Sequence, residues 1–287
     1  MIETNDSNDS STTPLSGFAG EGPGVRFIIA GGGTGGHIFP AIAIANALMK
    51  IDGTIEILFV GAKGKMEMEK VPQAGYNIEG LDIAGFNRSS LIKNIGLPVK
   101  LVKSFLQVRR IFKNFRPHAA IGVGGYSSFP VLRFAQARNI FSFIHESNSF
   151  AGRSNMMLGR KATKIFVATD GMQKFFPAKK IMVTGNPVRP DIVAVATIEK
   201  EEALNFFGMQ VNKKTVLVVG GSLGARSINE AIASGIDELI NAGLQIIWQT
   251  GKTDAAKWSE VAANRKEVWV SDFIKEMQYA YAAADIV

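Results

Sequence analysis

Two glycine-rich segments have the composition of loops that bind charged ligands. Gly31-Gly-Gly-Thr-Gly-Gly36 and Gly220-Gly-Ser-Leu-Gly-Ala225 each follow a short apolar run and precede a predicted helix. Glycine allows a backbone to approach a ligand closely, and the start of the following helix presents unpaired N–H groups and a positive dipole end. Phosphate binding is therefore one interpretation of both segments. A tight turn that only packs helix on strand is the other.

The residues around the first loop argue against two common nucleotide motifs. A dinucleotide-binding loop needs an acid about 20 residues further on, at the end of the second strand. That strand ends Val60-Gly61-Ala62 and carries Glu56 in its interior, and no Gly-Lys-Ser/Thr follows the loop as a P-loop requires. In the second loop, backbone N–H groups and the Ser222 hydroxyl would suit a diphosphate without a metal.

Histidine supplies the candidate acid–base chemistry. His37 lies just past the first loop at a helix start, where a neutral imidazole could accept a proton from a hydroxyl; a purely local hydrogen bond is the alternative. His145 and Glu146 end a predicted strand, where α/β proteins place ligand contacts, or they form a structural pair. The chain has three histidines, no two of them at metal-ligand spacing, and no cysteine, so the sequence predicts no metal site.

Alternating strand and helix patterns predict how these residues are positioned. Strands are expected at 25–30, 54–60, 119–125 (with a glycine turn), 141–145, 164–168, 215–219, 244–250 and 267–270, and helices at 38–50, 63–74, 101–115 and 200–207. Such alternation predicts an α/β architecture with parallel, doubly wound sheets. The turn-rich segment 183–190 places a boundary between two Rossmann-like domains, 25–188 and 189–287. A polar, acidic tail at 1–24 is expected to be disordered.

The net charge of +7 is concentrated in one stretch. Residues 83–145 contain ten Lys and Arg and no Asp or Glu, which indicates an anionic partner. Helix 101–115 within it is predicted to be amphipathic, with Val102 and Leu106 on its apolar face. No nucleic-acid motif accompanies the charge, and no apolar run approaches the roughly 18 residues of a membrane span. We therefore expect segment 86–116 to bind an anionic membrane surface rather than nucleic acid.

Six short strings occur in order along the chain. They are Gly31-Gly-Gly-Thr-Gly-Gly-His37 with Pro40, Gly122-Val-Gly-Gly-Tyr126 with Pro130, His145-Glu-Ser-Asn148 with Ala151-Gly152, Gly185-Asn-Pro-Val-Arg189, Gly220-Gly-Ser-Leu-Gly-Ala225 and Phe273-Ile274. In this order and spacing they closely resemble the MurG family of N-acetylglucosaminyltransferases. The resemblance runs from about residue 25 to the last residue, and its specificity lies in the set of strings rather than in any one of them.

The resemblance implies a GT-B fold, in which two Rossmann-like domains face a cleft, with the second domain incomplete in this chain. It implies inverting transfer of N-acetylglucosamine from UDP-N-acetylglucosamine to the C4 hydroxyl of undecaprenyl-pyrophosphoryl-N-acetylmuramoyl-pentapeptide, a step of peptidoglycan synthesis, with no metal or other cofactor. It also implies peripheral association with the cytoplasmic face of the bacterial inner membrane. The implied donor contacts are Thr34, Gly35, Gly36, Asn148, Arg189, Ser222 and Ile274. His37 is the implied general base, and Glu146 is the second choice.

The sequence departs from the family in three places. Ser147 stands where the family usually has Gln, the tail 1–24 is extra, and the family continues past residue 287 with a segment that contacts the donor. Since residues 284–287 begin another predicted strand, we expect the chain to be a fragment that binds UDP poorly by itself. A UDP-N-acetylglucosamine 2-epimerase, which shares the GT-B architecture, and an inactive nucleotide-sugar-binding fragment are the alternative functions. The basic, apolar segment argues against the epimerase, which needs no lipid substrate.

Overall fold

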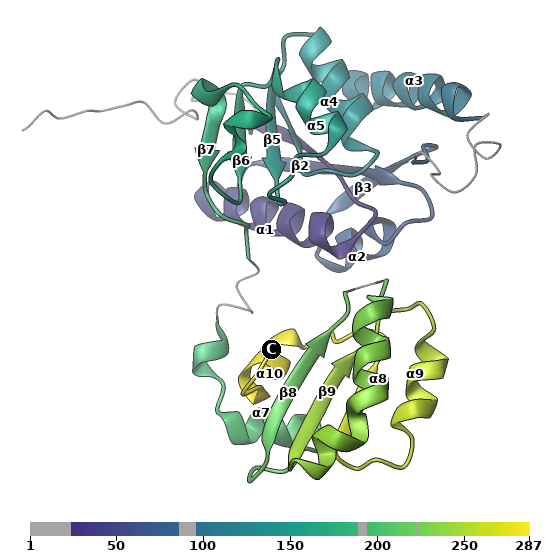
Figure 1. Ribbon diagram of the computed structural model, residues 1–287. Coiled ribbons are helices and arrows are strands. Elements are labelled where there is room, and N and C mark those ends of the chain that lie inside the picture. The colour runs from purple at the N-terminus through teal and green to yellow at the C-terminus, as the bar shows by residue number, and fades with distance from the viewer. Residues whose placement is uncertain (1–23, 86–95, 189–193, 222) are drawn as a thin grey trace, which may run out of the picture.

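The computed structural model describes residues 24–85, 96–188, 194–221 and 223–287, which form two α/β units (Figure 1). The first unit contains a seven-stranded sheet with strand order β3-β2-β1-β4-β5-β6-β7, and the second a three-stranded sheet with order β10-β9-β8. Every pairing between these strands is parallel, which confirms the predicted architecture. Residues 1–23 of the predicted tail and residues 86–95 of the predicted membrane-binding segment lie outside the described residues.

The strands of the first sheet are short and mostly apolar. They are β1 Arg26–Ala30, β2 Glu56–Ala62, β3 Asn77–Leu81, β4 Ala119–Gly122, β5 Phe141–Glu146, β6 Lys164–Val167 and β7 Ile181–Val183. Ile28, Ile29 and Ala30 are 0% exposed, as expected for a parallel strand covered on both faces. β1 pairs with β2 on one side and with β4 on the other. The chain therefore builds the sheet outward from β1 first in one direction and then in the other, while all strands stay parallel. Open α/β sheets bind ligands at the carboxyl ends of strands beside such a switch point.

Helices cover both faces of the first sheet (Figure 1). They are α1 Gly35–Ile51 and α2 Glu67–Gln73 on one face, and α3 Leu97–Phe115, α4 Ser128–Ala137 and α5 Arg153–Gly159 on the other. Ile38 and Val71 anchor the first pair of helices to one apolar cluster. Val108, Leu132 and Leu158 anchor the other three to a second cluster. Both glycine turns that lead into α1 and α4 therefore emerge from a rigidly packed sheet.

The second unit repeats this plan on a smaller scale. Its elements are α7 Lys200–Phe206, β8 Lys214–Val219, α8 Arg226–Asn241, β9 Leu244–Gln249, α9 Ala255–Ala262, β10 Val268–Ser271 and α10 Met277–Ala283. Trp248 and Trp258 are 0% and 2% exposed, and their ring centroids lie 5.8 Å apart in the cluster under α8 and α9. Ile286 bridges to Val216 in parallel, on the side of β8 away from β9.

The structure differs from the sequence-based expectations in several elements, among them the helices α4, α5, α9 and α10, which the sequence patterns did not predict. The strands β3 and β7 were not expected, because Asn77–Leu81 contains Glu79 and Gly80 and β7 has only three residues. Val102 and Leu106 of α3 were expected on the apolar face but are 63% and 62% exposed. The buried side of α3 carries Ser104, Val108 and Phe112 instead. Residues two positions apart lie about 200° apart around a helix, so Val102 and Leu106 face away from the sheet.

Within the described residues, no helix combines the length and the apolar character that crossing a bilayer would demand.

Candidate active site

The first glycine loop, residues 31–34, joins the carboxyl end of β1 to α1. Its first three N–H groups are occupied within the protein: Gly31 donates to Val60 O at 3.3 Å and Gly32 to Gly124 O at 3.3 Å. Gly33 donates to the Glu67 carboxylate at 2.8 Å. The N–H groups of Gly35 and Gly36 open α1, where no intrahelical acceptor exists. An anion at this loop would therefore meet the predicted positions 34–36 rather than 31–33.

His37 lies in the first turn of α1 and is half-buried. Its Nδ1 lies 3.1 Å from Gly32 O and 3.4 Å from Thr34 Oγ1. Because a carbonyl oxygen can only accept, the neutral ring is assigned its hydrogen on Nδ1, which leaves a lone pair on Nε2. A Cβ built on Gly124 would lie 2.7 Å from Nε2, so the ring sits against the loop that follows β4. Nε2 is therefore the atom of His37 that could accept a proton.

Glu146 ends β5, is 3% exposed, and has both carboxylate oxygens engaged. Oε1 accepts from the backbone N–H and the side-chain amide of Asn148 at 3.1 and 3.0 Å. Oε2 accepts from Gly152 N at 3.1 Å and from the Asn155 amide at 2.8 Å. A base must offer a free lone pair to its substrate, so this geometry supports His37 as the base. The hydrogen bonds of Glu146 instead hold Asn148 in position.

His145, the residue before Glu146, is 2% exposed. Its Nε2 lies 3.4 Å from Gly185 O and its Nδ1 lies 3.4 Å from Ser147 Oγ. Burial lowers the pKa of His145 below its ordinary value, while the Gly185 carbonyl and the charge of Glu146 oppose that shift. The charge of His37 also lowers the pKa of His145, so the two imidazoles are close enough to interact electrostatically. The carboxyl ends of β1 and β5 therefore bring the two predicted histidine positions together.

The second glycine loop joins β8 to α8 and is held by neutral groups. Gly220 N donates to Gln249 O at 2.9 Å. Asn229, on the first turn of α8, is 1% exposed; its amide donates to Thr250 O at 2.8 Å and its Oδ1 accepts from Trp248 Nε1 at 3.0 Å. Two buried side chains thus fix α8 against the end of β9. The predicted donor contact Ser222 in this loop, and the predicted contact Arg189, lie outside the described residues.

Ile274 follows β10, with its side chain 3% exposed in the core of the second unit. Its backbone N–H donates to Gln249 Oε1 at 3.1 Å, and Gln249 is itself 3% exposed at the end of β9. The N–H of Ile274 is therefore occupied. Its carbonyl is the backbone group that a ligand at this position could use.

The two units meet beside these loops. Lys70 Nζ of α2 lies 5.4 Å from the centre of the Phe273 ring, next to Ile274. A cavity of about 430 Å³ separates them, lined by Phe39 of α1 and by α2 on one side and by Phe273 and Lys275 on the other. The helix that carries His37 and the segment that carries Ile274 thus border one cavity between the units.

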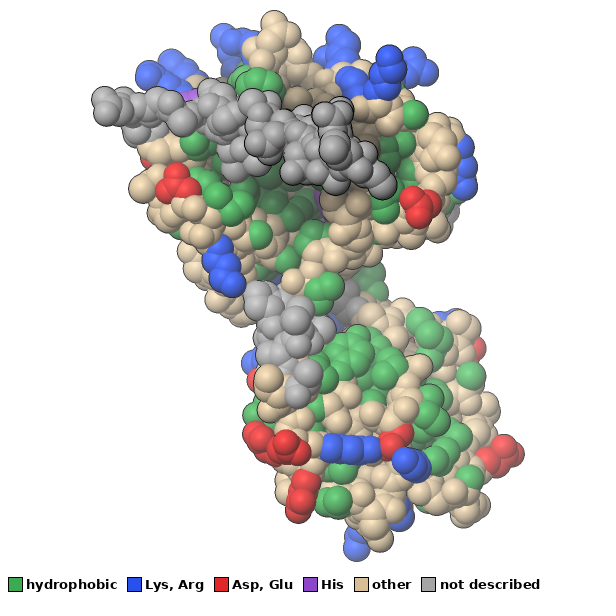
Figure 2. All heavy atoms as spheres, turned by 90° about the vertical axis from the view of Figure 1, so that its left-hand side faces the viewer, with side chains coloured by type: hydrophobic (Ala, Val, Ile, Leu, Met, Phe, Trp, Pro, Cys, Tyr) green, Lys and Arg blue, Asp and Glu red, His purple; other side chains and the backbone are tan. Residues whose placement is uncertain are grey.

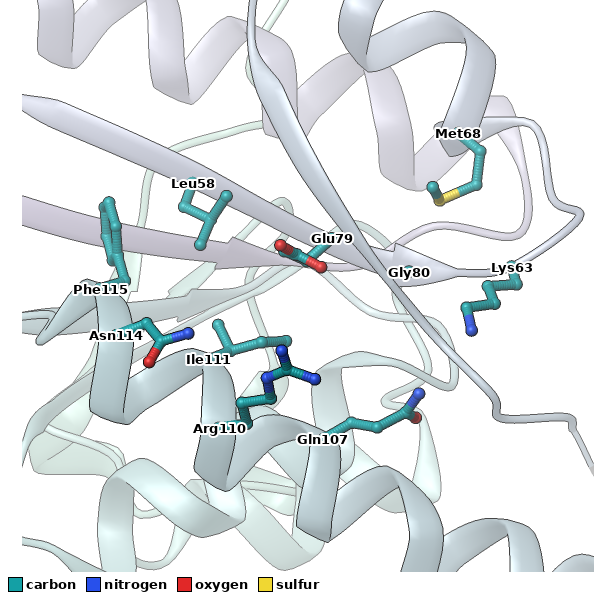
Figure 3. A pocket seen from close by; sticks show the side chains of 10 residues that line it. All are labelled: Leu58, Lys63, Met68, Glu79, Gly80, Gln107, Arg110, Ile111, Asn114 and Phe115. Carbon is teal, nitrogen blue, oxygen red and sulfur yellow. The ribbon is translucent and has the colours of Figure 1, made fainter.

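A larger cavity, about 610 Å³, lies between β3 and α3 and contains none of the predicted site residues (Figure 3). Its lining mixes Glu79 with Arg110 and Lys63 over an apolar floor that includes Ile111 and Phe115. This lining does not select one sign of charge, so it does not compete with the glycine loops as a diphosphate site. Among the described residues, no cluster of three or more His, Asp or Glu side chains could hold a metal ion.

Sequence reasoning missed three buried polar residues that support the site: Glu67, Asn229 and Gln249. Gln249 carried a local signal, because it is a polar residue at the end of the apolar strand Leu244–Gln249. Glu67 and Asn229 carried none, because only the packing of α2 and α8 against the strand ends gives them partners.

Two parallel α/β units, each with a glycine-rich loop after its first strand and a helix behind it, define a two-domain glycosyltransferase of the GT-B class. The model of the glycosyltransferase family 28 N-terminal domain matches residues 27–167, and that of its C-terminal domain matches residues 215–287. The chain belongs to the family of UDP-N-acetylglucosamine–N-acetylmuramyl-(pentapeptide) pyrophosphoryl-undecaprenol N-acetylglucosamine transferases, which confirms the resemblance to MurG.

Family membership rests on close relatives. A protein of this name from Parabacteroides distasonis is 53% identical over 265 residues, which are 91% of this chain and 72% of the relative. One from Phocaeicola vulgatus is 52% identical over 92% of this chain and 70% of the relative. The crystal structure of MurG from Acinetobacter baumannii matches with a TM-score of 0.62 at 28% identity, covering 91% of this chain and 71% of that one. A UDP-GlcNAc 2-epimerase from Neisseria meningitidis matches with a TM-score of 0.57 at 14% identity, over 90% and 74%, so it shares the fold alone.

Proposed function

We propose that this protein transfers N-acetylglucosamine from UDP-N-acetylglucosamine to the lipid-linked N-acetylmuramyl-pentapeptide carried by pyrophosphoryl-undecaprenol. The observation that carries the proposal is the 53% identity over 265 residues to a relative with that printed activity, a span that includes most of both units. The geometry of the two loops supplies a mechanism. The epimerase alternative has only a shared fold in its favour.

The second unit binds the donor. Loop N–H groups, the Ser222 hydroxyl and the start of α8 receive the diphosphate, and the positive end of the helix stabilises the charge that develops on UDP. The Ile274 carbonyl accepts the N–H of the uracil ring, since the Ile274 N–H is already bound to Gln249. Arg189 and Asn148 are further donor contacts. Thr34, Gly35 and Gly36 approach the donor from the first unit.

The first unit activates the acceptor. Nε2 of His37 takes the proton of the muramoyl C4 hydroxyl as that oxygen bonds to C1 of N-acetylglucosamine. The bond from C1 to the β-phosphate oxygen breaks, and its electron pair leaves with UDP. One displacement of this kind inverts the configuration at C1. Glu146 keeps Asn148 in place through the bonds to its backbone and side-chain amides.

The outer side of α3 supports binding to an anionic membrane surface. Val99, Val102 and Leu106 are 72%, 63% and 62% exposed. The bases of α3 flank them and continue toward its C-terminus, and Figure 2 shows Lys and Arg side chains along the end of the first unit that points away from the second. A cavity of about 420 Å³ near that end is lined by Arg109, Lys113, Arg116 and Arg138 around Phe112 and Phe134. This combination suits a peripheral protein on the cytoplasmic face of the inner membrane.

Transfer is tested with the full-length protein, labelled UDP-N-acetylglucosamine and a lipid-linked muramoyl-pentapeptide analogue. We expect label to enter the lipid product and UDP to be released only when the acceptor is present. Formation of UDP-N-acetylmannosamine without acceptor would instead identify an epimerase.

Membrane binding is tested by sedimentation with phosphatidylglycerol and phosphatidylcholine vesicles. We expect binding to the anionic vesicles only, weakened by salt. Replacing Arg109 and Lys113 with Gln should weaken it by about 2 kcal/mol, roughly 30-fold, at about 1 kcal/mol per base. Replacing Lys252 and Lys266 of the second unit with Gln makes the same charge change elsewhere and should leave binding intact. Equal binding to both vesicle types would remove the electrostatic argument.

A further inference from the structure

Glu67 is a buried carboxylate that the proposed reaction does not use. It opens α2, is 1% exposed, and has no ion-pair partner among the described residues. Its two oxygens instead accept main-chain hydrogens from two different segments: Oε2 from Gly33 N at 2.8 Å and Oε1 from Ala62 N at 2.9 Å. An ionised group leaves water only if such charge-assisted hydrogen bonds compensate it. The carboxylate therefore links the first glycine loop to the end of β2.

The chain makes room for this side chain at two glycines. A Cβ built on Gly32 would lie 2.2 to 2.6 Å from the carboxyl atoms of Glu67, and one built on Gly61 would lie 2.4 Å from its Cγ. Real contacts of that length do not occur, so any other residue at either position would push the carboxylate away from the loop. The loop and the end of β2 are thus shaped around Glu67.

One peptide group connects Glu67 to His37. The N–H of Gly33 and the C=O of Gly32 belong to the same planar unit. Glu67 accepts the hydrogen of that N–H, and His37 donates its Nδ1 hydrogen to that C=O, at 2.8 and 3.1 Å. The Glu67 carboxylate thus contacts one side of this peptide group, and the His37 imidazole contacts the other. Hydrogen bonds in such a chain polarise one another, so the carboxylate makes the Gly32 oxygen a stronger acceptor.

We propose that Glu67 is a positioning residue for His37, acting through the peptide group that joins Gly32 to Gly33. The inference rests on the proposed role of His37 as the base. Gly32 and Gly33 have φ values of +150° and +89°, a region where glycine moves freely and a peptide group turns over at little cost. Turned over, this peptide would aim its carbonyl at the Glu67 carboxylate and its N–H at His37. Glu67 therefore holds the hydrogen of neutral His37 on Nδ1, and the polarised carbonyl stabilises the imidazolium once Nε2 has taken the proton.

A merely structural role makes a different prediction. If Glu67 only fastened the turn between β2 and α2 through Ala62, its loss would lower stability. It would then leave the histidine tautomer and the pH profile of the reaction unchanged. The decisive readouts are therefore properties of His37 itself.

Glu67→Gln is the test variant, because glutamine keeps the shape but loses the charge and places an NH2 group against one of the two N–H donors. Glu69→Gln is the matched control, since Glu69 lies on the same helix with its side chain 59% exposed. Nitrogen-15 spectra of the imidazoles distinguish the two tautomers, and with three histidines in the chain the His37 signal is assigned by one substitution. In the full-length protein we expect an Nδ1–H signal for the parent and Glu69→Gln, and a tautomer mixture for Glu67→Gln.

The kinetic arm uses the same two variants. Glu67→Gln should lower kcat by about 10- to 100-fold, the scale known for losing the hydrogen-bond partner that orients a metal-bound histidine. The KM for UDP-N-acetylglucosamine should stay within about twofold, and the acidic limb of the kcat/KM profile should move to lower pH because His37 becomes less basic. An unchanged tautomer together with an unchanged acidic limb would overturn the proposal. So would loss of all three folded histidine signals, which would make Glu67 a folding residue.

The two arms separate this inference from the proposed function. If the full-length protein transfers no sugar to the lipid-linked acceptor, the proposed function fails while the tautomer comparison still decides the role of Glu67. If transfer occurs but Glu67→Gln keeps the parent tautomer and pH profile, the function stands and the inference fails.

Discussion

The two glycine loops share a plan but are held by opposite means. Each follows the first strand of its sheet and leads into a long helix. The loop at 31–34 is fastened by the Glu67 carboxylate. The described part of the second is held by neutral groups: Gly220 N donates to Gln249 O, and the Asn229 amide fixes the start of α8 by donating to Thr250 O and accepting from Trp248 Nε1. The backbone contact is also close, since a Cβ on Gly251 would lie 2.0 Å from Gly224 N.

This difference matches the charge that each loop is proposed to meet. A loop that holds a diphosphate needs a positive local field, and a neutral amide supports it without adding negative charge. A loop that holds a base benefits from a nearby negative charge, which favours the protonated imidazole as the reaction proceeds. The comparison supports the proposed division, in which the first loop mainly serves catalysis and the second mainly donor affinity, and each prediction below tests that division.

The largest effect is expected from a substitution beside the first loop. His37→Ala removes the proposed base, so in the full-length protein kcat should fall by about 10²- to 10⁴-fold, the usual scale for general base catalysis. UDP affinity, measured by calorimetric titration, should change little because the diphosphate is proposed to lie on the second loop. His118→Ala is the control, since His118 lies before β4 at the opposite end of the strand from Gly124. A His37→Ala enzyme within a few-fold of the parent would show that the base is another group.

The second prediction concerns a substitution that places a carboxylate behind the second loop, as Glu67 is placed behind the first. Asn229→Asp can still accept from Trp248, but it loses the donor to Thr250 O and places a carboxylate behind the proposed diphosphate site. At an effective dielectric constant near 20, a unit charge roughly 8 Å away is worth about 2 kcal/mol; for a phosphate at about that separation, UDP should bind roughly 30-fold more weakly. Asn241→Asp makes the same charge change at the exposed far end of α8 and should leave affinity unchanged. If both variants bind UDP like the parent, the sign of charge behind the loop does not matter.

The third prediction concerns the segment that is proposed to contact uracil. Gln249→Ala leaves the Ile274 N–H without its acceptor, and the segment after β10 should lose its fixed position. One lost hydrogen bond is worth about 0.5–1.5 kcal/mol, so UDP affinity should fall about 2- to 10-fold while kcat stays near the parent value. Gln245→Ala is the matched control: it is buried on the same strand but bonds to Gln210 and Thr215. Equal losses of affinity in the two variants would indicate general destabilisation.

Local patterns were enough to predict most of the fold. The strand at 26–30, the glycine turn and the helix after it follow one another within a few residues, so composition and spacing reveal them. β7 escaped prediction because three residues between turn-forming segments carry no periodicity. The orientation of α3 was wrong because exposed Val102 and Leu106 suit a surface that meets an apolar partner, and helical spacing alone does not say which stripe faces the sheet.

The candidate site was predictable only where a single segment carries it. Residues 34–37 lie together in one glycine-rich string, so the resemblance to the MurG family could point to them through that string. Glu67 and Gly33 are separated by 34 residues, and the topology of the sheet brings them together. The alternative role of Glu146 as base depended on whether its oxygens were free, and that is decided by Asn148, Gly152 and Asn155, whose contacts the sequence does not display.

The smallest expected effect concerns the place where the first unit leads into the second. Buried His145 contacts the carbonyl of Gly185, which follows β7 on the way to the second sheet. Burial lowers the pKa of His145 in the folded protein, so at mildly acidic pH the unfolded chain binds more protons than the folded one. Stability from this residue is therefore complete above its ordinary pKa of about 6.5 and is lost as the pH falls below that value.

His145→Gln tests that sign, because glutamine can still donate to Gly185 but does not titrate. Urea unfolding followed between pH 7.5 and 5 should show the parent losing more stability than His145→Gln as the pH falls. The difference should be small, because the Gly185 carbonyl and the Glu146 charge both oppose the shift. All other groups are common to both proteins, so only the difference between the two curves reports on His145. If the parent instead lost less stability than the variant, His145 would be stabilised in its charged form. The first unit would then carry a buried positive charge beside Glu146, and the division of charge between the two loops would need to include it.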